Sequence, residues 1–143
     1  MNVMAIQTES ELLDIADQLR EELVARGNEI DKNRYLPQDL ADKLASLGFY
    51  RLVAPEPLGG LGVSPEFFCR ICESLAKGNG STAWCVFIGA TSQYLFGALP
   101  TSQLKKMLAN PNVITSGVFA DSGTAEEKKR DGRPGYLLSL IHI

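Results

Sequence analysis

The stretch Ser81-Thr-Ala-Trp-Cys-Val-Phe-Ile-Gly-Ala-Thr-Ser-Gln-Tyr-Leu-Phe96 decides the fold class of this chain. No charged residue occurs between Lys77 and Lys105, and a soluble protein rarely leaves such a stretch facing water. The apolar run Ala83–Ala90 is interrupted by Thr91-Ser92-Gln93, so it is shorter than the roughly 20 apolar residues that span a membrane. We therefore predict a central bundle helix over residues 81–96 that is packed on nearly all sides.

Two consequences of this assignment are specific. Trp84, Phe87 and Ile88 are expected to be buried by the helices that precede them. The patch Thr91-Ser92-Gln93 is expected inside the bundle or on a ligand cavity, because buried polar groups need hydrogen-bond partners.

The bulk properties of the chain exclude several classes of protein. Its 143 residues suffice for one domain with a real core, and 45% hydrophobic and 22% charged residues are ordinary for a globular protein. The net charge of −3 argues against a nucleic-acid surface. The basic run Lys128-Lys129-Arg130 is offset by two preceding acids and is interpreted as a solvated turn. We expect neither a nucleic-acid nor a membrane partner.

Helical periodicity and capping residues place the other helices. Thr8-Glu-Ser-Glu11 is a capping box that opens a first helix running to about Arg26, and the polar segment Asn28–Tyr35 is interpreted as a loop. Pro37 lies in the first turn of a second helix, which Gly48 ends. Ser64-Pro65 opens a third helix.

The pattern changes after residue 112. Val113–Ala120 is rich in β-branched and aromatic residues and predicts a strand, Asp121–Thr124 is typical of a turn, and another strand begins at Gly135. The predicted fold class is mainly α, with a helical domain over residues 1–112 and the start of a truncated β-domain over residues 113–143. Residues 139–143 do not continue the pattern, and we expect a truncation or reading-frame change there.

Three cysteines and no secretion signal indicate a reducing compartment, so a cytoplasmic location is expected. Cys69 and Cys72 have the spacing of a redox or zinc motif. They lie well inside the third helix rather than at its N-terminus, and Cys85 and His142 alone remain to complete a zinc site. We therefore predict buried structural cysteines and no metal.

Five segments occur in an order that resembles the N-terminal region of the acyl-CoA dehydrogenase superfamily. They are Arg34–Pro37, Leu47–Glu56, Gly59–Gly62, Gly80–Trp84 and Gly117–Ala125, and the resemblance extends over residues 8 to 138. It implies a helical N-terminal domain, a middle β-domain and a C-terminal four-helix bundle, with flavin bound between the last two. The cofactor implied is FAD, or alternatively FMN or reduced flavin supplied by a reductase.

The resemblance implies site residues in two groups. The cofactor-binding residues are expected to be Phe119, Ala120, Ser122, Gly123, Thr124 and Ala125, acting largely through backbone N–H groups. Trp84, Thr91 and Ser92 are expected to line the substrate or flavin cavity, although Trp84 is equally well explained as a core aromatic. No catalytic residue is assigned, because the family's carboxylate base belongs to the C-terminal bundle.

Two activities within the superfamily are compatible with these segments. One is α,β-dehydrogenation of an acyl-CoA thioester with hydride transfer to flavin N5. The other is hydroxylation by a two-component flavin-dependent monooxygenase. Ser92 stands where the hydroxylase branch usually has a histidine, and Val118 stands where it often has a serine. These departures favour the dehydrogenase.

The resemblance also implies a small-molecule substrate, such as an acyl-CoA, and a homo-oligomer, a dimer or tetramer, for the full-length protein. The 143-residue chain alone is expected to be inactive and to lose its flavin. A non-catalytic helical interaction module is the alternative from another class. The unpaired edges of its strands would argue against it.

Overall fold

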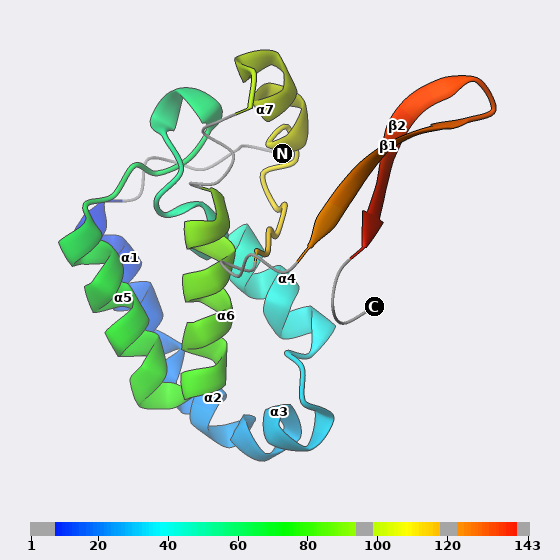
Figure 1. The fold of residues 1–143 in the computed structure, drawn as a ribbon. Helices are drawn as coiled ribbons and strands as arrows, with labels where there is room; N and C mark the ends of the chain where they lie inside the picture. Colours follow the sequence, from blue (N-terminus) through cyan, green and yellow to red (C-terminus); the bar gives the residue numbers. More distant parts are fainter. Residues whose placement is uncertain (1–7, 94–98, 118–122, 140–143) are drawn as a thin grey trace.

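The computed structural model describes residues 8–93, 99–117 and 123–139. In this part of the chain a bundle of helices precedes a β-hairpin that projects to one side (Figure 1). The elements are α1 (Glu9–Gln18), α2 (Arg20–Ala25), α3 (Gly27–Asn33), α4 (Gln38–Ser46), η1 (Phe49–Arg51), η2 (Glu56–Leu58), α5 (Pro65–Gly78), α6 (Gly80–Thr91), α7 (Thr101–Met107), β1 (Thr124–Arg130) and β2 (Arg133–Ser139). The predicted fold class, mainly α with a β segment at the end, is confirmed.

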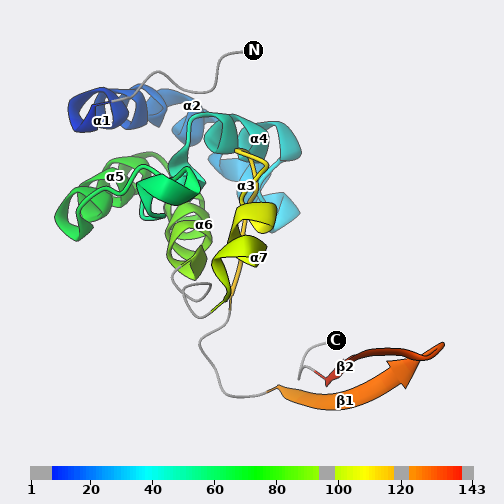
Figure 2. The same ribbon diagram turned by 90° about the horizontal axis from the view of Figure 1, so that it is seen from above.

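Helix α5 organises the core. The Ser64 hydroxyl accepts a 3.1 Å hydrogen bond from the Phe67 N–H, and Pro65 occupies the first turn, as predicted. One side of α5 packs against α6 and another against α1 and α2 (Figure 2). The fully buried side chains between these helices include Leu12, Ala16, Leu23, Phe67, Ile71, Leu75 and Val86. Burial of this apolar set supplies the main driving force for folding of the helical domain.

The N-terminal helical segment is longer than predicted. The capping box at Thr8 is confirmed, but the expected loop at residues 28–35 is wrong. Leu19 separates α1 from α2, and Arg26 separates α2 from α3. Helical hydrogen bonds continue across both residues, and the Ile30 N–H donates to the Arg26 carbonyl at 3.1 Å. Ile30 is buried, so a polar-looking segment is held helical by one core residue. The helix ends at Arg34, whose φ of 59° is left-handed.

Helix α6 differs from its prediction at its start and in its burial. Asn79 caps it, with its side chain accepting a 2.8 Å hydrogen bond from the Thr82 N–H. Val86 and Ala90 are buried, but Trp84 is 63% exposed and Phe87 37% exposed. The prediction of a helix packed on nearly all sides is therefore wrong on this face, because no other described element covers it. Residues 94–96 lie outside the described residues.

Two further predictions about this region have definite outcomes. Ile88 is half-buried rather than buried. No helix in the described part of the chain is long and apolar enough to cross a membrane.

The β segment is a two-stranded antiparallel hairpin. Strand β1 pairs with β2 from Thr124 opposite Ser139 to Arg130 opposite Arg133. Asp131 and Gly132 connect the strands with φ values of 52° and 76°, the Asp-Gly chemistry of a tight hairpin turn. The strand predicted to start at Gly135 is confirmed, with its start earlier at Arg133.

The first predicted strand is wrong where it can be checked. Residues 113–117 form no strand, and residues 118–120 lie outside the described residues. Lys128-Lys129-Arg130 belongs to β1 rather than to a turn. This run of two acids and three bases satisfies its backbone groups by pairing with β2, which the charge pattern alone did not reveal. The division into domains at residue 112 stays a prediction.

Candidate functional site

Three aromatic side chains from α5 and α6 form a continuous strip on the surface of the helical domain. The Trp84 and Phe87 rings stack with centroids 5.9 Å apart and an interplanar angle of 19°. Phe87 stacks in turn on the buried Phe68, at 5.5 Å and 22°. Beside the strip lies an open hollow of about 340 Å³, lined by Cys72, Glu73, Ala76, Gly80, Ala83, Trp84 and Phe87. This surface can receive a planar apolar group by stacking.

The other two predicted substrate residues lie at the C-terminal end of α6. The Thr91 hydroxyl donates to the Phe87 carbonyl at 2.7 Å, and the buried Ser92 hydroxyl donates to the Ile88 carbonyl at 2.6 Å. Both protons are therefore used within the helix, which leaves only oxygen lone pairs for a ligand. Their role in substrate binding stays a prediction.

Two buried polar side chains, Arg51 and Gln93, donate hydrogen bonds to backbone carbonyls. The Arg51 Nη2 donates to the carbonyls of Leu58 and Leu108 at 3.0 and 3.4 Å, and the Gln93 Nε2 donates to the Tyr50 carbonyl at 2.7 Å. Neither Arg51 Nε nor Gln93 Oε1 has a partner among the described residues. Burial lowers the pKa of Arg51.

The sequence indicated the position of Gln93 but not the burial of Arg51. The patch containing Gln93 was expected inside the bundle or on a ligand cavity, and Gln93 is buried. Arg51 was not considered. The available signal was its position within the apolar segment Phe49–Ala54, where a single charged side chain is surrounded by core residues.

The predicted flavin-binding residues lie at the start of the hairpin or just before it. Phe119, Ala120 and Ser122 are outside the described residues, whereas Gly123, Thr124 and Ala125 are exposed. Strand β1 pairs with β2 alone in the described part of the chain, so its second edge is open. An open backbone edge fits one wall of a flavin site, because its N–H groups are available as donors. The described residues supply no second wall.

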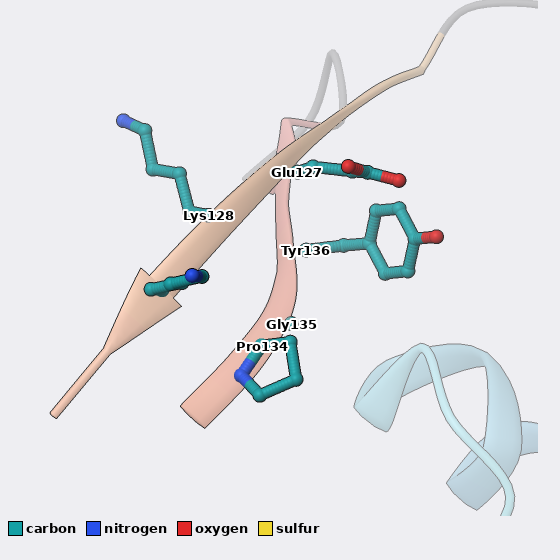
Figure 3. A pocket seen from close by; sticks show the side chains of 6 residues that line it. Glu127, Lys128, Pro134, Gly135 and Tyr136 are labelled. Atoms are coloured by element: carbon teal, nitrogen blue, oxygen red, sulfur yellow. The ribbon is translucent and has the colours of Figure 1, made fainter. Parts of the chain in front are cut away.

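The hairpin itself is hollowed on its surface. A shallow depression of about 480 Å³ is lined by Glu127, Lys128, Lys129, Pro134, Gly135 and Tyr136. Figure 3 shows Glu127 and Tyr136 on one side of the ribbon and Lys128 on the other, as their pairing register requires. Tyr136 and Leu138, which share a face, are 67% and 65% exposed. We read this depression as the uncovered face of a sheet rather than as a binding site.

The three cysteines are free thiols that differ in exposure. Cys69 is exposed, which contradicts its predicted burial, and Cys72 and Cys85 are half-buried. Burial, reinforced by Cys69, raises the pKa of Cys72 to about 12, and burial also raises the pKa of Cys85. Both half-buried thiols are therefore protonated and poor nucleophiles at neutral pH. The described residues contain no group of three or more His, Cys, Asp or Glu residues that could hold a metal.

Comparison with known families decides the assignment of the helical domain. Residues 7–109 match the family model described as "Acyl-CoA dehydrogenase, N-terminal domain". The chain belongs to the acyl-CoA dehydrogenase family. The match includes the aromatic strip, Arg51 and Gln93, but ends before the hairpin.

Similar proteins include both kinds of enzyme considered above. An indole-3-acetate monooxygenase from Acinetobacter baumannii is 36% identical over 104 residues, which are 72% of this chain and 26% of that protein. A benzylmalonyl-CoA dehydrogenase from Aromatoleum aromaticum is 29% identical over 66% of this chain and 23% of its own length. This chain thus spans about a quarter of the length of these relatives.

A solved structure shares the fold. The HsaA monooxygenase from M. tuberculosis superposes with a TM-score of 0.78 and 26% identity, covering 92% of this chain and 35% of the other. The superposed part covers 92% of this chain, which is more than the family match over residues 7–109. The structural likeness therefore extends beyond the helical domain.

Proposed function

We propose that the complete protein is a flavin-dependent monooxygenase of the acyl-CoA dehydrogenase family that hydroxylates a small aromatic compound. The observation that carries this proposal is the 36% identity to an indole-3-acetate monooxygenase over 72% of the chain. The likeness to the HsaA structure supports it. The departures at Ser92 and Val118 favoured a dehydrogenase, but two positions weigh less than 36% identity over 104 residues.

The aromatic strip gives the proposal a physical basis in this chain. Trp84 and Phe87 are exposed and nearly parallel, so they can stack against an aromatic ring and exclude water from one of its faces. At the other end of α6, the half-buried Thr91 would offer an oxygen lone pair, and the fully buried Ser92 would support the end of the helix through its bond to the Ile88 carbonyl. A substrate held in this way would be oriented before reaction, which is a large part of catalysis.

The hairpin edge would hold the cofactor. Gly123, Thr124 and Ala125, with Phe119, Ala120 and Ser122 before them, would present backbone donors to a flavin. When bound, FAD, FMN or a reduced flavin supplied by a reductase would provide the redox chemistry that inserts oxygen. This chain's contribution is to bind and orient one side of that group. Other parts of the complete protein, and a second subunit of a dimer or tetramer, would complete the site.

Dehydrogenation of an acyl-CoA thioester is the second candidate. The benzylmalonyl-CoA dehydrogenase relative favours it, and so do the departures at Ser92 and Val118. In this case a carboxylate from another part of the protein would remove the α-proton, while the aromatic strip would contact the acyl group.

One experiment separates the two candidates. The full-length protein is purified and supplied with reduced flavin and labelled molecular oxygen in the presence of small aromatic acids and phenols. The proposal expects labelled oxygen in the organic product, detected by mass spectrometry. Electron-acceptor reduction by acyl-CoA thioesters without oxygen, and no labelled product, would favour the dehydrogenase instead.

A matched pair of variants tests the role of the strip. Trp84→Ala removes the exposed ring and is expected to lower the kcat/KM for hydroxylation by about 2- to 12-fold, since a stacked aromatic pair contributes about 0.5 to 1.5 kcal/mol beyond its buried area. Val24→Ala changes an equally exposed apolar residue of α2, 60% exposed, and is expected to leave kcat/KM unchanged.

A further inference from the structure

A second hollow adjoins Trp84, and no residue of α5 lines it. Its volume is about 270 Å³, and its lining comes from the C-terminal end of α3, the segment after it and the first two turns of α6: Ile30, Asp31, Arg34, Tyr35, Leu36, Ser81, Trp84 and Cys85. We call this hollow the Arg34 pocket. Trp84 is thus shared between the aromatic strip and the Arg34 pocket. A ligand stacked on Trp84 can extend into either.

The backbone holds Arg34 in a conformation that is unusual for its residue type. Its φ of 59° is left-handed, a conformation that is unfavourable for a non-glycine residue. The Arg34 N–H donates to the Ile30 carbonyl at 2.8 Å, and Ile30 is anchored in the core. The position of the arginine beside the pocket is therefore fixed by the fold.

The Arg34 side chain is also electrostatically available. Arg26 pairs with Glu29 and Asp39 at 2.8 and 2.6 Å, whereas Arg34 has no ion pair or side-chain hydrogen bond among the described residues. A guanidinium is suited to bidentate binding of a carboxylate. Asp31 is the one carboxylate in the pocket lining, and its charge opposes that of an anionic ligand.

We propose that the Arg34 pocket binds the carboxylate of a small aromatic acid whose ring stacks on Trp84 and Tyr35. This inference rests on the proposed function and deepens it, because it names the class of aromatic substrate. The two aromatic side chains are 63% and 66% exposed, so their faces are accessible. The volume lies just below the range of about 300 to 1,000 Å³ usual for ligand pockets, which suits one ring with a short acidic side chain.

The sole tryptophan makes the proposal directly measurable. Because the chain contains one tryptophan, emission excited at the red edge of the absorption band, where tyrosine does not absorb, reports on Trp84 alone. The experiment titrates the flavin-free 143-residue chain with phenylacetate and, separately, with its neutral isostere phenylacetamide. Phenylacetate is expected to change the emission and to bind about tenfold more tightly than the amide, the effect of one charge-assisted contact.

Variants assign the preference to the named side chains. Arg34→Asn, which tolerates the left-handed backbone, is expected to reduce phenylacetate affinity to that of phenylacetamide. Asp31→Asn is expected to increase phenylacetate affinity, since it removes a like charge. Arg70→Asn, an exposed arginine of α5 outside the pocket lining, is the matched control and should change neither affinity. Far-UV circular dichroism verifies that each variant is folded.

The outcomes are distinct from those of the activity test. Equal affinity for the acid and the amide, unchanged Trp84 emission, or an Arg34→Asn variant that binds phenylacetate normally would overturn this inference. Added salt should weaken phenylacetate binding and spare phenylacetamide; equal loss of both would also contradict it. Binding without hydroxylation would instead contradict the proposed function alone.

Discussion

The Thr115 hydroxyl donates a 2.7 Å hydrogen bond to the Gly89 carbonyl, 26 residues earlier in the chain. This contact ties the segment after α7 to the last turn of α6. It depends on the absence of a side chain at Gly89, where a Cβ atom would lie 2.5 Å from Tyr50 Cδ1 and 3.4 Å from the Thr115 carbonyl oxygen. Three separate segments therefore meet at one glycine.

Replacing this glycine is expected to destabilise the helical domain. In Gly89→Ala the Tyr50 ring must move, and overpacking of this kind costs about 1 to 3 kcal/mol. Gly80→Ala is the matched control, because a Cβ atom there meets nothing within 4 Å. Urea unfolding monitored by circular dichroism should show a lower midpoint for Gly89→Ala and little change for Gly80→Ala. Equal midpoints would show that the Tyr50 ring can move without loss of stability.

The pH dependence of stability is expected to reflect Asp17. The Ser74 hydroxyl donates to its carboxylate at 2.6 Å, and this bond is the main reason why the pKa of Asp17 lies below its ordinary value of 3.8, with Arg20 and Lys77 contributing. The resulting stability is complete above pH 3.8 and is lost as the pH falls through the lowered folded-state pKa.

Ser74→Ala tests this linkage. Its melting temperature should lie below that of the parent at neutral pH, and the gap should narrow as the solution is acidified below pH 3.8. Ser46→Ala removes an exposed hydroxyl that donates to a backbone carbonyl, so any gap it produces should not vary with pH. A Ser74→Ala gap that stays constant down to pH 2 would refute the assignment to Asp17.

The three thiols are expected to react at different rates. Cys69 is exposed, whereas Cys72 is half-buried with a pKa of about 12. A disulfide reagent at neutral pH should therefore label one thiol rapidly and the other two slowly, because the thiolate is the reactive form. Cys69→Ser should abolish the rapid phase. Cys72→Ser should retain it.

Trp84 is expected to contribute little to the stability of the 143-residue chain. Truncating an exposed side chain usually changes stability by less than about 0.5 kcal/mol, whereas Leu75→Ala, at a fully buried position, should cost about 2 to 5 kcal/mol. Thermal unfolding of both variants provides the comparison. A large loss in Trp84→Ala would mean that the ring is covered in solution, which the aromatic-strip proposal does not allow.

Local signals in the sequence predicted the helix starts well. The capping box at Thr8 and the Ser64-Pro65 pair satisfy specific backbone N–H groups, so they mark their positions without knowledge of the rest of the fold. The five family segments were equally informative, because they occur in a fixed order. The five segments led to the acyl-CoA dehydrogenase family, which the comparison confirms.

Burial and strand position were harder to predict. The lack of charge in α6 predicts an apolar helix, but it does not say which residues cover each face. The predicted burial of Trp84 was therefore wrong. The polar segment around Ile30 is helical, with Ile30 itself buried in the core. The Asp131-Gly132 turn was a usable signal that was overlooked in favour of the β-branched residues at 113–120. The corner formed by Arg34 and Trp84 joins residues 50 positions apart, which only the folded chain brings together.

The hairpin turn has a practical use for studying the protein. The turn between β1 and β2 protrudes away from the helical domain (Figure 2). It is formed by Asp131 and Gly132, and a Cβ atom at Gly132 meets nothing within 4 Å. Exposed tips with small polar residues tolerate added sequence far better than packed positions do. A short epitope or fluorophore-acceptor peptide inserted between these two residues would mark the molecule for imaging or capture while leaving the helical core and both hollows beside Trp84 undisturbed.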